Sequence, residues 1–213
     1  MTHDPRYGTQ HGTSSHWSGY AVAGTGATHV IGTWTEPAVT CAPGETSWSS
    51  AWVGIDGDVS NTVEQIGSDS NCLKGTPVYD VWYEMYPKSP VILPLAVSPG
   101  DSLTGEVTYA SGTFTLTLTD TTTNASFQTT QQSKKAQLTS VEWIGEGLSN
   151  KPLSDFGSVS FTGASATIGG QSGGVGSFPA AEAITMVTSQ GVSRAVPSGV
   201  TGKKSFDVSW QSP

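Results

Sequence analysis

The stretch YDVWYEMYP, residues 79–87, alternates between two kinds of side chain with a period of two. Because successive side chains of a β-strand point to opposite faces of a sheet, this period predicts a strand with two different faces. One face should belong to the hydrophobic core, through Tyr79, Val81, Tyr83 and Met85. The other face presents an acidic and aromatic row, which consists of Asp80, Trp82, Glu84 and Tyr86.

The rest of the chain from Trp17 onward repeats this pattern of short β-rich runs, separated by Gly, Ser, Asn and Pro. Many short strands with regular turns and no long helical period predict an all-β, antiparallel β-sandwich of two packed sheets. A hairpin is expected around the ASG turn at residues 110–112, and a short helical turn in AAEAITMV at residues 180–187. Nothing in the sequence resembles a linker, so we expect a single domain over residues 17–213 after a flexible N-terminal arm over residues 1–16.

Charged residues are scarce, at 12% of the 213 residues against roughly 25% in an average globular protein. The net charge of −8 and the isoelectric point of 4.7 make nucleic acid and anionic membranes poor partners. No apolar run reaches the ~18 residues expected of a membrane span. Since the chain has few salt bridges to lose at low pH, its composition predicts tolerance of acid.

The chain has two cysteines, Cys41 and Cys72. A disulfide between them would suit a secreted protein, and two unpaired thiols in the core are the alternative. The arm contains His3, His11 and His16, whose irregular spacing and lack of a matched cysteine or carboxylate set favour solvated histidines over a metal site. We therefore expect an extracellular location and no bound metal.

Two further stretches place carboxylates on one face of a strand. In AWVGIDG, Trp52 and Asp56 share a face, and in VEWIGEG, Glu142 and Glu146 share a face. Together with residues 79–87, three strands present carboxylates, two of them with aromatic neighbours. This arrangement favours a carboxylate-lined cleft on one sheet. A solvated outer face is the alternative, although such faces usually carry Lys, Thr and Ser.

The motifs of several catalytic classes are absent. The sequence has no G-x-S-x-G elbow, no H-E-x-x-H motif and no D-[TS]-G pair, and His29 is the only histidine after the arm, which argues against a serine triad, a zinc hydrolase and an aspartic protease. Two carboxylates in an aromatic cleft would suit a glycosidase. One carboxylate beside an amide would instead suit attack of water on a carbonyl, since the carboxylate takes the water's proton and the amide N–H stabilises the oxyanion.

The segments AWVGIDGD, EQIG, YDVWYEMYP, VEWIGE and FGSVSF, taken in this order, resemble the glutamic peptidases, or eqolisins, of peptidase family G1. The resemblance runs from about Trp17 to Trp210 and covers most of the chain. It implies a lectin- or glucanase-like jelly roll and an acid endopeptidase with no cofactor and no covalent intermediate. The implied partners are polypeptide substrates, and we expect a monomer.

By matched position, the resemblance places the catalytic glutamine on Gln65, in a turn, and the catalytic glutamate on Glu146. Glu146 would act as general base and then as acid, and Gln65 would stabilise the oxyanion. Glu142 would be a supporting residue, although it is locally almost equivalent to Glu146. The residues that would line or support the cleft are Trp52, Asp56, Asp80, Trp82, Glu84 and Tyr86.

The sequence departs from the fungal pattern at two positions beside these residues. Gly147 follows Glu146 where the family has an aspartate, and Glu64 precedes Gln65 where the family has a more apolar residue. Strand alternation turns Glu64 to the face opposite Gln65. The alternative function is a carbohydrate-binding or glycoside-hydrolysing β-sandwich, because aromatic clefts also bind sugars. The amide at position 65, where a glycosidase would need a second carboxylate, favours the peptidase.

Overall fold

The computed structural model describes residues 3–6 and 12–213, and almost all of its regular elements are strands. The elements over these residues are β1 (Thr13–Ser14), β2 (Trp17–Ala23), β3 (His29–Thr35), β4 (Ser50–Ile55), β5 (Val63–Leu73), β6 (Thr76–Tyr86), β7 (Val91–Ile92), β8 (Ser102–Ala110), β9 (Thr113–Asp120), β10 (Ala125–Gln131), β11 (Ser140–Glu146), β12 (Ser158–Ile168), β13 (Gln171–Gly174), the 3-10 turn η1 (Val175–Ser177), β14 (Ala181–Val187), β15 (Ser193–Pro197) and β16 (Phe206–Trp210).

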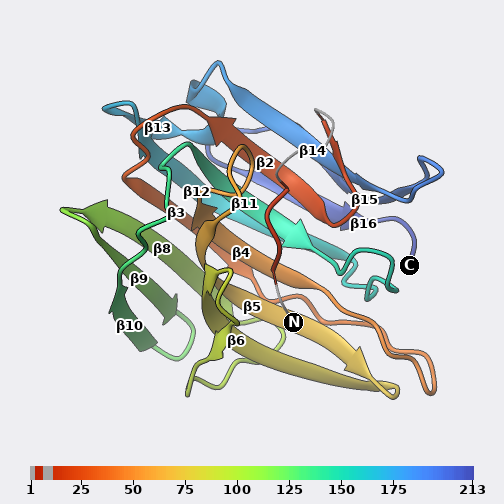
Figure 1. The fold of residues 1–213 in the computed structure, drawn as a ribbon. Helices are drawn as coiled ribbons and strands as arrows, with labels where there is room; N and C mark the ends of the chain where they lie inside the picture. Colours follow the sequence, from red (N-terminus) through yellow and green to blue (C-terminus); the bar gives the residue numbers. More distant parts are fainter. Residues whose placement is uncertain (1–2, 7–11) are drawn as a thin grey trace.

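Two sheets share strand β14 and pack against each other (Figure 1). In spatial order the first sheet contains β10, β9, β8, β3, β12, β16, β15 and β14, and the second continues from β14 through β2, β11, β4, β5, β6 and β7. Strand β13 pairs with β12 at the side of this path, and β1 pairs with β14. Apart from the parallel pair β1–β14, the paired strands of the described residues are antiparallel. The predicted all-β antiparallel sandwich is therefore confirmed.

The second sheet, β2–β11–β4–β5–β6, has two apolar faces. Its inner face adds Val53, Trp143 and Val81 to the main core between the sheets, where they meet residues such as Trp34 and Phe161 from the first sheet. Its outer face has a smaller buried cluster, which consists of Trp17, Ala21, Trp52, Val63, Trp82, Ile144 and Ile184, with Tyr86 packed against it. The division follows the period of two predicted from the sequence.

Two local predictions have different outcomes. The hairpin around residues 110–112 is present, since β8 and β9 are joined by Ser111 and Gly112, whose φ angles of 49° and 85° are those of a tight turn with two left-handed residues. The helical turn predicted at residues 180–187 is wrong. This segment is strand β14, because its backbone pairs with β2 and β15 and these tertiary hydrogen bonds outweigh the helical propensity of Ala and Glu.

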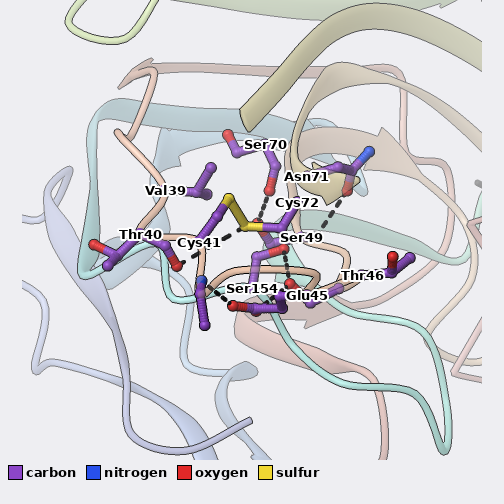
Figure 2. The surroundings of a disulfide bond; sticks show 12 residues. Val39, Thr40, Cys41, Glu45, Thr46, Ser49, Ser70, Asn71, Cys72 and Ser154 are labelled. Atoms are coloured by element: carbon purple, nitrogen blue, oxygen red, sulfur yellow. Dashed lines mark hydrogen bonds between the residues drawn. A yellow bond between two sulfur atoms is a disulfide. The ribbon is translucent and has the colours of Figure 1, made fainter. Parts of the chain in front are cut away.

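Cys41 and Cys72 form a disulfide, with their Cα atoms 5.6 Å apart. The bond, shown in Figure 2, ties the loop before β4 to the end of β5. The backbones of Ser47 and Cys72 also exchange hydrogen bonds of 3.0 Å. The disulfide spans 31 residues of sequence. By the chain-entropy model, a loop of this length contributes about 4 kcal/mol to the free energy of unfolding.

The described parts of the predicted arm are packed against the second sheet. His3 is fully buried and His16 is 7% exposed, so the expectation of solvated histidines is wrong at both positions. The His3 ring stacks on Trp82 with 3.6 Å between ring centroids, and its Nδ1 atom lies 3.3 Å from Oε2 of Glu146. These contacts offset the cost of removing the ring from water. His11 lies outside the described residues, and the domain boundary at residue 17 stays a prediction. Across the described residues there is no helix with the length and apolar character that a membrane crossing requires.

Candidate active site

Four adjacent strands, β11, β4, β5 and β6, align their outward side chains in three rows across the second sheet. The first row is Glu146, Ser50, Asp69 and Asp80. The second is Ile144, Trp52, Gly67 and Trp82, and the third is Glu142, Gly54, Gln65 and Glu84. Because every second residue of a strand faces the same side, all three rows lie on one face. Most of the predicted site residues are therefore neighbours on one surface.

Gly67, in the middle row, allows strands β4 and β5 to approach each other closely. A Cβ atom at this position would lie 2.5 Å from the carbonyl oxygen of Ala51 and 2.5 Å from Cβ of Trp52. No side chain larger than hydrogen fits at that distance unless the backbone moves. The glycine therefore fixes where Trp52 lies between its neighbours.

Glu146 lies at the end of β11 and is buried. Its Oε2 atom accepts a hydrogen bond of 2.6 Å from the indole N–H of Trp52. The Trp52 ring is itself held by an edge-to-face contact with Trp17, at 4.9 Å between ring centroids. Burial raises the pKa of Glu146 well above the usual range, and the hydrogen bond from Trp52 opposes this rise.

Gln65 lies within strand β5, so the turn expected at this position is absent. Its Nε2 group donates to the backbone carbonyl oxygen of His3 at 2.9 Å and to Oε2 of Glu84 at 3.2 Å. The same Glu84 oxygen accepts the backbone N–H of His3 at 2.9 Å. Burial raises the pKa of Glu84 to about 8. Gln65 and Glu84 thus hold a peptide backbone between them.

Asp69 joins the site although the sequence did not point to it. Its Oδ1 atom accepts the indole N–H of Trp82 at 2.8 Å and lies 3.7 Å from Nε2 of His3. Burial raises the pKa of Asp69 to about 7. The available signal was the alternation Val63, Gln65, Gly67, Asp69, which continues the Gln65 face for two residues beyond the EQIG segment.

The other predicted supporting residues lie further from this centre. Asp56 has a φ of 70° at the end of β4, and its carboxylate accepts the backbone N–H groups of residues 137, 138 and 139 at 2.7–2.9 Å, which fixes the segment that leads into β11. Asp80 is half-buried and pairs with Asp69 across the strands. Tyr86 packs against the buried cluster on the outer face and lines a pocket with Asp4 and Pro5.

Glu142 is fully buried, and neither of its carboxyl oxygens has a hydrogen-bond partner among the described residues. It lies four residues from Glu146, or about 13 Å along the strand. Burial raises its pKa well above the usual range. The two glutamates, almost equivalent in sequence, therefore have different surroundings: Glu146 contacts Trp52 and the N-terminal segment, and Glu142 lies among carboxylates near Asp56 and Asp58.

The two sequence departures are also explained locally. A Cβ atom at Gly147 would lie 2.6 Å from Cδ1 of Leu153, so an aspartate there would require the Leu153 side chain to move. Glu64 lies on the other face of β5, as alternation predicts, and is fully buried.

Within residues 3–6 and 12–213, no group of three or more His, Cys, Asp or Glu side chains is arranged to hold a metal ion.

Comparison with known proteins gives the same class as the fold and the site. Residues 15–210 match the model of the Peptidase A4 family. The chain is 35% identical over 189 residues to aspergillopepsin-2 of Aspergillus niger, which covers 76% of this chain and 67% of the relative. The solved structure of scytalido-glutamic peptidase with a peptide-based transition state analogue has a TM-score of 0.79 and 27% identity, over 93% of this chain and 99% of that one. SCP-B, an eqolisin solved with the tripeptide Ala-Ile-His, has a TM-score of 0.76 and 25% identity, over 93% and 99% of the two chains.

A β-sandwich with a cleft of tryptophans and carboxylates, and these similarities, define a hydrolase of the glutamic-peptidase type. The chain belongs to the Peptidase A4 family, the G1 glutamic peptidases.

Proposed function

We propose that the protein is an acid endopeptidase in which Glu146 and Gln65 activate a water molecule for attack on a peptide carbonyl. The observation that supports this most strongly is that both groups contact the same residue of the segment in the cleft, Gln65 at its backbone and Glu146 at its side chain. Gln65 donates from its amide to the carbonyl oxygen of His3 at 2.9 Å, and Glu146 lies 3.3 Å from Nδ1 of the same residue. The cleft thus holds a peptide within reach of an amide donor and a carboxyl group.

In the proposed reaction, ionised Glu146 takes a proton from water as the water oxygen attacks the scissile carbonyl carbon. The Gln65 N–H stabilises the oxyanion, since a donor already aimed at the carbonyl oxygen needs no reorganisation as charge develops. Protonated Glu146 then gives its proton to the leaving nitrogen, and the C–N bond breaks. The Trp52 N–H keeps Glu146 oriented throughout.

The carboxyl cluster supports an acidic working range. Burial raises the pKa of Glu84 to about 8 and that of Asp69 to about 7, so both groups are uncharged in acid. Repulsion between neighbouring carboxylates is then smallest, and only Glu146 needs to ionise. Water in the cleft reduces the desolvation of Glu146 and so lowers its pKa toward the usual range of a carboxyl group.

The substrate we propose is an extended polypeptide, in keeping with the peptide ligands of the solved relatives. The Cys41–Cys72 disulfide supports a secreted, extracellular protein, because such bonds persist in oxidising compartments. We further propose that the protein acts as a monomer, which light scattering at the assay pH would test.

The test is digestion of a denatured protein between about pH 2 and pH 7 by the wild type, Glu146→Gln and Gln65→Ala, with Glu142→Gln as the matched control. The proposal predicts acid proteolysis that both dyad variants lose and the control largely keeps. If Glu142→Gln were the inactive variant, the assignment within VEWIGE would be wrong. If no variant and no wild-type protein cleaved any substrate, the peptidase proposal would fail.

A further inference from the structure

A pocket with positively charged side chains lies beyond the end of the second sheet at which Glu146 is placed. It is formed by the loop after β11, the turn between β14 and β15, and Ser15, which precedes β2. In Figure 1 the loop after β11 lies beside β15 and Pro213. The pocket has a volume of about 460 Å³, which is within the range of small-ligand sites.

The charge of this pocket is opposite to that of the whole chain. Lys151 and Arg194 are the charged side chains that line it, and no Asp or Glu of the described residues does so. The whole chain has 17 acidic residues against 9 Lys and Arg, with a net charge of −8. Because two basic side chains meet here without an acidic one, the pocket attracts anions.

Arg194, on β15, is only 4% exposed. Its guanidinium donates to the backbone carbonyl oxygens of Ser15, at 3.3 Å, and of Lys151. Both acceptors are neutral, and across the described part of the chain no carboxyl group forms an ion pair with Arg194. Burial lowers the pKa of Arg194. A buried charge without a counter-charge costs free energy, and an anion in the pocket would offset that cost.

The Arg194 guanidinium also has donors left for a ligand. An arginine presents five N–H groups in a planar fork, and the two carbonyl oxygens accept one from Nη1 and one from Nη2. Nε and the second hydrogens of Nη1 and Nη2 have no partner among the described residues. Since Arg194 lines the pocket, these donors suit a carboxylate, whose two oxygens match the fork.

The pocket is close to the proposed catalytic glutamate. Trp17 is the cross-strand partner of Glu146, and the backbone N–H of Gly147 donates to the carbonyl oxygen of His16 at 2.9 Å. Ser15 precedes Trp17 by two residues, or about 7 Å of extended chain, and paired strand residues lie about 5 Å apart. The Cα atoms of Ser15 and Glu146 are therefore within about 12 Å of each other. An extended substrate spans this distance with about four residues.

We propose that this pocket is a substrate subsite in which Arg194 and Lys151 bind the carboxylate of an Asp or Glu side chain within four residues of the cut bond. This inference rests on the proposed function and adds a preference for acidic substrate residues to it. The preference depends on the charge of the substrate. It should be largest above the usual glutamate pKa of about 4.3, and it should disappear in stronger acid, where the substrate carboxyl group is neutral.

The test compares kcat/KM for peptides that differ only in having Glu or Gln at one of the four positions on either side of the cut bond. At about pH 5 one position should favour Glu by about tenfold, and the ratio should approach one at about pH 3. Arg194→Met should bring the ratio at pH 5 to about one, and Lys151→Gln should lower it by about two- to fivefold. Lys134→Gln, at an exposed lysine that does not line the pocket, is the matched control and should leave the ratio unchanged.

The ratio separates charge recognition from a purely structural role of Arg194. Loss of the bonds to Ser15 and Lys151 lowers the rates for the Glu and Gln peptides alike and leaves their ratio unchanged. If Arg194→Met does not fold, the wild type and Lys151→Gln still measure the preference, because Lys151 is exposed and its bond to Arg194 uses the backbone oxygen.

Binding is measured without catalysis by NMR titration of Glu146→Gln with the same peptides and with succinate. The Arg194 Nε–H signal should shift with the Glu peptide and not with the Gln peptide. A shift with succinate alone, and no preference for Glu at any position, would make the pocket a site for small free carboxylates and overturn the subsite. Proteolysis at equal rates for every Glu and Gln pair would overturn the subsite but leave the proposed function standing. A wild type that cleaves no peptide at any pH would remove the proposed function and the subsite with it.

Discussion

Glu64→Gln should stabilise the protein at neutral pH and have little effect in acid. Glu64 is fully buried, and neither carboxyl oxygen has a hydrogen-bond partner among the described residues. Burial raises its pKa in the folded protein to about 8 from the 4.5 of an unperturbed group. Below that unperturbed value the carboxyl group is protonated in both states, so its contribution to stability is fully retained.

As the pH rises above 4.5, the Glu64 carboxyl group ionises in the unfolded chain but stays protonated in the folded protein. Each pH unit between the two pKa values then lowers the free energy of unfolding by about 1.4 kcal/mol. At pH 7 the accumulated loss is about 3 kcal/mol, from 2.5 units at that slope. Glutamine has nearly the shape of the protonated acid and does not ionise, so Glu64→Gln should recover most of this loss.

Urea unfolding at about pH 4, 5.5 and 7 measures this effect. The difference between Glu64→Gln and the wild type should grow from near zero to about 3 kcal/mol. Asp207→Asn, at an exposed position, is the matched control. A stability difference between the wild type and Glu64→Gln that stays constant over the whole pH range would contradict this prediction, because Glu64 would then bind protons equally in the folded and unfolded states.

Three further sets of substitutions test the active site and the contacts that hold its strands in place. Trp52→Phe removes the N–H donor to Glu146, so the pKa of Glu146 should rise, kcat should fall by about 10- to 100-fold, and the acid limb of the kcat–pH profile should move to higher pH. Replacing Cys41 and Cys72 together by Ser should lower the free energy of unfolding by about 4 kcal/mol, measured by denaturant unfolding. Gly67→Ala should cost about 1–3 kcal/mol of stability and lower kcat as well, because the new methyl group displaces β4 at Trp52.

Two of these changes, Trp52→Phe and Gly67→Ala, have a control elsewhere in the chain. Trp210→Phe removes an indole donor to the backbone of Leu153, outside the cleft, and should leave the pH profile unchanged. Gly199→Ala adds a methyl group with no atom within 4 Å and should leave stability and kcat unchanged. A Trp52→Phe profile that matches the wild type, or a Gly67→Ala protein as stable as Gly199→Ala, would contradict the geometry. Unchanged unfolding without the cysteines would contradict the role of the disulfide.

The fold was predictable because strand alternation is a strong signal in this chain. In the sequence around Trp82 and Glu84, alternation already distinguishes the side chains that enter the core from those that line the cleft. The structure places each of these side chains on the predicted face. The β14 segment was mispredicted, since Ala and Glu favour a helix locally and only pairing with β2 and β15 makes it a strand.

The site was less predictable than the fold. Strand alternation puts Glu142 and Glu146 on one face and cannot separate them, so the choice of Glu146 came from the family resemblance. Asp69 was missed because its strand extends further than the EQIG segment. His3 was missed because a short polar terminus has no periodicity, and its place depends on contacts with residues far along the chain, such as Trp82.

In the proposed mechanism, Glu146 and Gln65 act together on a peptide carbonyl. The most direct measurement is kcat at about pH 4 for the wild type, Glu146→Gln, Gln65→Ala and the double variant. We expect kcat to fall by about 10³-fold or more in Glu146→Gln and by about 10²- to 10³-fold in Gln65→Ala, and the double variant to be no slower than Glu146→Gln. A kcat near the wild-type value in either single variant would mean that the two residues do not form the catalytic pair.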